Sequence, residues 1–175
     1  TITLRTKKSL MKGFNGSINL SFVQGRYHKS PNSFQFNYRT AKFNLFTNLS
    51  YSYWSGFNDQ TLLRTFRKNG AVTSVFDQKA DQRNTSHNYN GRVGMDYSVN
   101  AKTTIGVLVT GIASPRVWQN RGRADIRNGA GALDSFNTVF TENRDNWNHF
   151  GSNINFRRVL PGSGHELTAD MDYLR

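Results

Sequence analysis

Apolar and polar residues alternate strictly along several stretches of the chain, and this alternation predicts antiparallel β-strands. The first stretch has apolar side chains or glycine at every second position from Phe14 to Phe22, with Asn and Ser between them. A period of two residues is that of a strand with one apolar and one polar face. About seven such stretches predict strands near residues 13–24, 33–39, 43–54, 88–99, 103–113, 148–159 and 166–174.

The links between these strands alternate in length. Links of a few residues join the second strand to the third, the fourth to the fifth and the sixth to the seventh, whereas segments 55–87 and 114–146 are each about thirty residues long. Outer-membrane β-barrels have short periplasmic turns and long extracellular loops. We therefore predict an all-β fold, an antiparallel transmembrane β-barrel segment in which 55–87 and 114–146 are long extracellular loops.

Assigning each strand a direction across a membrane separates the aromatic residues into two groups. The group at the periplasmic ends contains Phe14, Tyr38, Phe43, Tyr97 and Phe156. The group at the outer ends contains Phe22, Phe34, Tyr51, Tyr53, Tyr89, Phe150 and Tyr173. Two aromatic girdles are typical of transmembrane barrels, although aromatic residues also favour strands in general.

The same alternation predicts which side chains face lipid and which face the lumen. The lipid-facing set is Phe14, Ile18, Leu20, Phe36, Leu45, Leu49, Val93, Val107, Ile154 and Phe156. The lumen-facing set is Asn15, Asn19, Asn44, Asn48, Asn90, Arg92, Asp96, Asn153, Asn155 and Arg157. A polar lumen would also explain why the chain contains 20 Asn among 175 residues, since Asn is unfavourable inside helices.

A soluble antiparallel β-sandwich that binds an anionic ligand or nucleic acid is the alternative, because its strands would show the same alternation around a dry core. Two features favour the barrel. The strands have the length of about nine to eleven residues that a tilted transmembrane strand needs, and the links alternate between short and long.

Composition narrows the class further. The chain has no Cys, which excludes a disulfide scaffold and a Cys-based zinc site. The longest nearly apolar run, Ile105–Ala113, is much shorter than the ~20 residues of a membrane-spanning helix. The chain begins with Thr1 rather than Met and shows no export signal, so we expect that processing or truncation has removed its start.

Residues 2–8 (Ile-Thr-Leu-Arg-Thr-Lys-Lys) and the stretch Gly13–Leu20 resemble a known family. They are similar to the strand that closes the plug and to the first barrel strand of the TonB-dependent outer-membrane receptors, in particular their outer-membrane β-barrel family. Further similar stretches are residues 42–46, 56–59, 94–97, 102–107 and 166–170. Together they span nearly the whole chain.

The resemblance implies a plugged barrel of about 22 strands, with residues 1–8 as the last plug strand and 13–175 as a partial barrel. The chain lacks the plug body, the TonB box and the later barrel strands of these receptors, so we expect it to be a fragment. The implied function is energised uptake of a scarce solute (siderophore, vitamin, glycan or peptide) across the outer membrane of a Gram-negative bacterium. The implied partners are outer-membrane lipid and lipopolysaccharide, the receptor's own plug and the TonB energy-transducing complex.

The predicted loops contain the candidate contacts for an anionic ligand or for lipopolysaccharide phosphates. They are Arg64, Arg67, Lys68, Arg116, Trp118, Arg121 and Arg123. Arginine presents a planar fork that suits carboxylate and phosphate, although these residues could equally be solvated loop charges.

Other function classes have less support. Nucleic-acid binding would fit the net charge of +12, but the aromatic residues and the arginines do not share one strand surface. The four histidines (His28, His87, His149 and His165) form no catalytic or metal motif, and we expect them to be solvated loop or lumen residues. We predict no enzyme activity, no cofactor and no metal.

Overall fold

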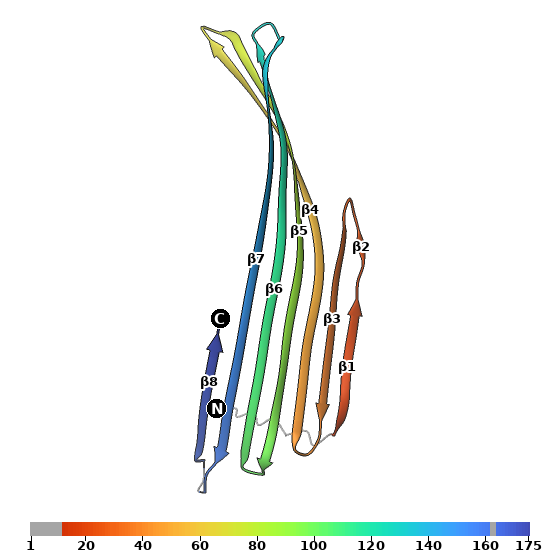
Figure 1. Cartoon of the computed structure of the whole chain (residues 1–175), viewed down its shortest axis with the longest axis vertical. Coiled ribbons are helices and arrows are strands. Elements are labelled where there is room, and N and C mark those ends of the chain that lie inside the picture. The colour runs from red at the N-terminus through yellow and green to blue at the C-terminus, as the bar shows by residue number, and fades with distance from the viewer. Residues whose placement is uncertain (1–11, 162–163) are drawn as a thin grey trace, which may run out of the picture.

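The computed structural model describes residues 12–161 and 164–175, which form one antiparallel β-sheet (Figure 1). Its strands are β1 (Gly13–Leu20), β2 (Val23–Gln24), β3 (His28–Arg39), β4 (Phe43–Lys68), β5 (Ala71–Asn100), β6 (Thr103–Asn128), β7 (Leu133–Val159) and β8 (Glu166–Leu174). Their order in the sheet is β1-β3-β4-β5-β6-β7-β8, and β2 pairs with β3. The all-β antiparallel prediction is confirmed. The predicted plug strand 1–8 lies outside the described residues.

The four central strands are much longer than the sequence pattern predicts. Strands β4 to β7 have 26, 30, 26 and 27 residues and rise far above β1, β3 and β8 (Figure 1). The prediction that 55–87 and 114–146 are loops is therefore wrong, because the β4–β5 ladder continues to Lys68 and Ala71 and the β6–β7 ladder to Arg127 and Leu133. Backbone pairing needs no apolar alternation, so this polar part of the ladder gave no sequence signal.

The first hairpin also differs from its prediction. The strand predicted at 13–24 is interrupted at Ser21 and Phe22, and β3 begins at His28 rather than at residue 33. At the interruption, the Ser21 backbone N–H donates to Asn32 Oδ1 (3.1 Å), and Ser30 Oγ donates to the Ser21 carbonyl (3.0 Å). Side chains thus supply hydrogen bonds where the ladder is broken.

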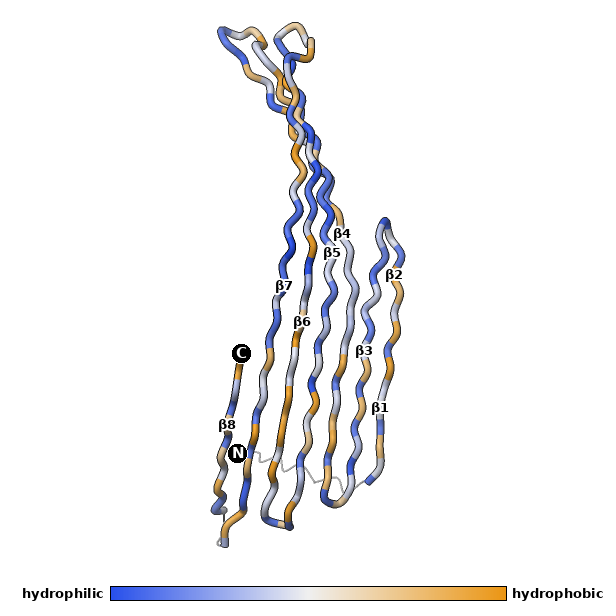
Figure 2. The backbone as a smooth tube through the Cα atoms, viewed as in Figure 1, coloured by the Kyte–Doolittle hydropathy of each residue, from blue (hydrophilic) through white to orange (hydrophobic). Residues whose placement is uncertain are grey.

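The strand registers bring the predicted apolar positions to one face of the sheet, which we call the apolar face. Phe43 pairs with Tyr97, Tyr97 with Ile105, and Ile105 with Phe156, so one row crosses four strands. The opposite, polar face contains the ten residues predicted to line a lumen. Hydrophobic residues are concentrated in the lower half of β4 to β7, and the middle of the long strands is hydrophilic (Figure 2).

The described residues contain no second layer that covers either face. Among them, Ala80 is the one buried hydrophobic residue, and side chains such as Phe14 and Met171 are more than two thirds exposed. A sandwich would bury the apolar face against a second sheet, so these residues do not form the alternative fold. The described part of the chain also has no helix long and apolar enough to cross a membrane.

Candidate functional site

The apolar face has a band of aliphatic side chains bounded by two rows of aromatic rings. On β5 the band runs from Tyr97 at the lower row to Tyr89 at the upper row, with Val93 midway. Along β4 it extends from Phe43 to Tyr53, which is about 33 Å of strand and about 25 Å of height at the tilt typical of a barrel.

The upper row is a continuous series of ring contacts. Centroid distances are 5.9 Å for Phe22 and His28, 4.5 Å for His28 and Tyr53, 5.0 Å for Tyr53 and His87, and 5.0 Å for Tyr51 and Tyr89. The Tyr51 hydroxyl and His87 Nδ1 are 3.0 Å apart. The loop and lumen positions predicted for His28 and His87 are therefore wrong, because both lie on strands within the aromatic row, although His28 is exposed to solvent as predicted. The two-residue spacing of His87 from Tyr89 was the signal that could have placed it.

The polar face is connected by hydrogen bonds between side chains of neighbouring strands. Asn44 donates to Asp96 (3.2 Å), and Asn153 donates to Asp172 (2.8 Å). Arg157 forms an ion pair with Glu166 at 2.7 Å. The polar face has more hydrogen-bonding groups than the sheet itself can supply with partners. Such a face stays hydrated or binds a polar partner.

The seven residues predicted as loop contacts do not form one site. Register places Arg64, Arg116 and Trp118 on the polar face, and Arg121 and Arg123 on the same side as the apolar face. Arg67 and Lys68 lie at the tip of the β4–β5 hairpin. Two separate surfaces therefore replace the single basic rim expected from the sequence.

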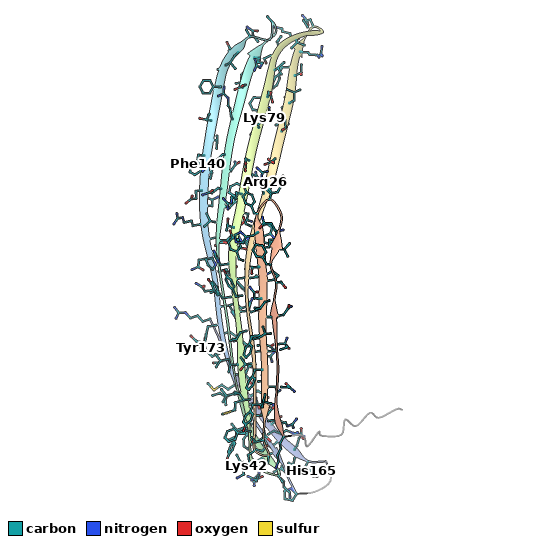
Figure 3. The ribbon with its side chains drawn as sticks, turned by 90° about the vertical axis from the view of Figure 1, so that its right-hand side faces the viewer. Arg26, Lys42, Lys79, Phe140, His165 and Tyr173 are labelled. Carbon is teal, nitrogen blue, oxygen red and sulfur yellow. The ribbon has the colours of Figure 1, made fainter. Side chains whose placement is uncertain are left out.

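Arg121 and Arg123 lie against aromatic rings of β7. The Arg121 guanidinium is 5.4 Å from the centroid of Phe140, and that of Arg123 is 4.7 Å from the centroid of Phe136. Arg123 also forms an ion pair with Asp125 at 2.8 Å. Figure 3 shows Phe140 and Tyr173 on the same side of the sheet. The surface that Arg121, Arg123 and the two phenylalanine rings form therefore faces the same side as the apolar band below it.

Arg26 lies in the turn between β2 and β3 (Figure 3). Its contacts join the short β2–β3 hairpin to the long strands β4 and β5. Its guanidinium contacts Asp59 at 2.7 Å and Asp81 at 3.7 Å, and stacks 4.3 Å from the Phe57 centroid. Asp59 and Asp81 are directly opposite each other in the β4–β5 register, where like charges repel. The hydrogen bond with Asp59 raises the pKa of Arg26 further above its already high usual range.

Glu142 on β7 connects two of the long strands. Gln119 Nε2 on β6 donates to it at 2.8 Å, and Arg144 on its own strand donates at 2.9 Å. The Gln119 hydrogen bond and then the Arg144 hydrogen bond lower the pKa of Glu142 below its ordinary value of 4.5.

All three tryptophans of the chain lie on the polar face, whereas the sequence analysis named only Trp118, as a contact in a predicted loop. Trp54 is on β4, Trp118 on β6 and Trp147 on β7. Their positions near the upper aromatic row would suit an interfacial girdle, but they point to the opposite side of the sheet from that row. Counting the two-residue alternation onward from the predicted strands would have assigned each tryptophan to the polar side.

These features define an open, single-layer antiparallel sheet with one apolar and one polar face. Comparison with known proteins adds no relative, since no family model, no curated protein and no solved structure matches the chain.

Proposed function

We propose that the chain is part of a β-barrel in the outer membrane of a Gram-negative bacterium. In this proposal the apolar face contacts lipid, and the polar face lines the lumen and contacts a plug. The observation that carries it is the exposed aliphatic band, about 33 Å long on β4, between two rows of aromatic rings. With the strand tilt of a barrel this length would span the lipid-facing band of about 25 Å, and exposure of such a band to water would be unfavourable.

The upper parts of β4 to β7, residues 54–86 and 116–145, then project outside the cell; we call them the extension. Arg121 and Arg123 would meet the phosphates of lipopolysaccharide, since they lie directly above the lipid-facing side. Arg64, Arg116 and Trp118 would instead face the solute path. The division of the basic residues between two faces thus gives each group a separate partner.

Within this class we propose a TonB-dependent receptor for energised uptake of a scarce solute. The support is the sequence resemblance of residues 2–8 and 13–20 to the plug end and first barrel strand of such receptors. The proposed partners are the receptor's plug and the TonB energy-transducing complex. The role requires no enzyme activity from the described strands.

Single cysteines introduced at neighbouring positions test the membrane arrangement, because the chain has no Cys of its own. Val93→Cys faces the apolar side, Arg92→Cys the polar side, and Lys79→Cys the extension. In isolated outer membranes a water-soluble maleimide should label Arg92→Cys and leave Val93→Cys unlabelled. In intact cells Lys79→Cys should be labelled.

The outcome that contradicts the proposal is equal labelling of positions 92 and 93. In the free sheet Val93 is 43% exposed, so a soluble protein would react there as well. Labelling of both positions after extraction into urea is the control that each cysteine can react.

A further inference from the structure

The polar face contains a concentrated group of tryptophans and cations at the base of the extension, which we call the tryptophan surface. It consists of Trp54, Trp118, Trp147, Arg116 and Lys29. Trp54 is opposite Ser86, and Ser86 is opposite Arg116, so Trp54 lies about 10 Å from Arg116 across two strand spacings. Trp118 is two residues along β6 from Arg116, about 7 Å away. Trp147 is the diagonal neighbour of Arg116 on β7, on the other side of it from Trp118 and about 7–8 Å from Arg116.

The indole rings remain available to a ligand. Trp54 is 39% exposed and Trp147 57% exposed, the latter stacked on His149 with centroids 6.2 Å apart. The Trp54 ring lies flat over Gly56, where any Cβ would overlap it. Glycine at this position is thus required for the orientation of the ring.

The charge of the surface is positive and incompletely neutralised. Lys29 Nζ lies 5.3 Å from the Trp54 ring centroid. Arg116 is exposed, and although Asp145 lies opposite it in the register, no carboxylate of the described residues comes within 4.0 Å of its guanidinium. A free arginine fork between exposed rings suits a carboxylate on the ligand.

Amide side chains surround Trp118. Asn84 and Asn143 are its cross-strand neighbours on β5 and β7, and Asn120 follows it on β6. The Oδ1 atoms of Asn84 and Asn120 are buried and have no hydrogen-bond partner among the described residues, whereas Asn143 is exposed. Amides both donate and accept hydrogen bonds, as hydroxyl groups do, so they can pair with a molecule rich in hydroxyls.

We propose that the tryptophan surface binds an acidic saccharide, a sugar ring with a carboxylate. The apolar face of the ring packs on an indole, the Asn amides pair with its hydroxyls, and Arg116 pairs with its carboxylate, while Lys29 beside Trp54 pairs with the carboxylate of a neighbouring sugar unit. The inference rests on the proposed function, since it takes this face to line the solute path, and it names the class of solute.

Calorimetric titration of the full-length protein, purified from its outer membrane in detergent, tests the inference. The probes are oligogalacturonate, the neutral maltooligosaccharide, and 2,3-dihydroxybenzoate as an aromatic anion without a sugar. Oligogalacturonate should bind at least about tenfold more tightly than either other probe. Trp147→Ala should weaken its binding by about tenfold, and Arg116→Gln should remove the preference for the acidic over the neutral sugar.

The matched control is Phe140→Ala, on the same strand but the opposite face, where an equally exposed ring is removed. It should change affinity by less than about twofold. Gly56→Ala keeps every proposed ligand group but displaces the Trp54 ring, and should also weaken binding.

No binding of oligogalacturonate, equal or tighter binding of a control probe, or equal effects of Trp147→Ala and Phe140→Ala would each overturn the inference. The labelling at positions 92 and 93 separates its failure from failure of the proposed function. A membrane-inserted protein that binds no sugar refutes the saccharide site alone, whereas a sugar-binding protein labelled at both positions refutes the membrane arrangement.

Discussion

At the scale of single residues, the two faces differ most clearly at Val93, which lies midway between the two aromatic rows. Arginine at the midplane of an outer-membrane barrel costs about 2–4 kcal/mol. Val93→Arg should therefore lower the amount of folded protein in the outer membrane. The measurement is the heat-modifiable band of membrane fractions on gels.

Leu63→Arg is the matched control for this prediction. Leu63 is on the same side of the sheet and 64% exposed, but it lies in the extension, above the band. Its yield should equal that of the wild type, and equal losses in both variants would count against a lipid-facing band.

Glycine 94 shows how one residue allows close packing on the polar face. The Phe46 ring lies over it, and any Cβ at this position would overlap the ring. Gly94→Ala should lower the free energy of unfolding in urea by about 1–3 kcal/mol, the usual cost of overpacking. At Gly111 a Cβ meets nothing within 4 Å, so Gly111→Ala should leave the free energy of unfolding unchanged or raise it.

At the scale of elements, the Arg26 contact holds the short β2–β3 hairpin against β4 and β5. Removal of its charge by Arg26→Gln leaves Asp59 and Asp81 facing each other without compensation. Amide exchange of residues 23–30 should become faster by a few-fold, and 1 M salt should reduce the difference because the pair is exposed. Unchanged exchange would mean that the ring contacts of Tyr27 and Phe57 hold the hairpin by themselves.

Glu142 makes the pairing of β6 and β7 in the extension dependent on pH. Its pKa is lower in the folded chain, so its contribution to stability is present above the ordinary value of 4.5 and is lost as pH falls through the lowered value. The protection factors of amide exchange in residues 117–121 and 140–144, corrected for the slower intrinsic exchange at acid pH, should fall on acidification below about pH 4.5. Glu142→Gln should remove most of this pH dependence, and an unaltered dependence would assign it to other carboxylates.

The sequence predicted the lower half of each strand well because one face there is apolar and the other polar, so the residues alternate. Phe43 to Tyr53 is the clearest case. Prediction from the sequence failed for the extension because polar residues occupy both sides of the sheet there, as at Gln60 and Asp81. No two-residue alternation of apolar and polar residues is left to detect. One local signal was nevertheless present, since Asn69–Gly70 is a strong hairpin sequence, and both residues have the positive φ of that turn (51° and 84°).

At the scale of the whole molecule, β1 and β2 both pair with β3, each later strand pairs with its neighbours in the sequence, and the sheet of described strands ends at β1 and β8. This order is the simple meander that the short links predicted. The candidate site was less accessible to sequence reasoning. The six basic candidates were chosen by charge, but their sorting onto two faces depends on the register of strands of 26 to 30 residues that the pattern did not reveal.

The height of the extension has a practical consequence. About 50 Å of strand separates Tyr53 from the turn at Asn69 and Gly70, a tip with open space around Gly70. In the proposed outer-membrane arrangement, a foreign peptide inserted in this turn would stand well above the cell surface on a long hairpin. Antibodies would then reach such an epitope on living bacteria, and the protein would serve as a scaffold for vaccine antigens.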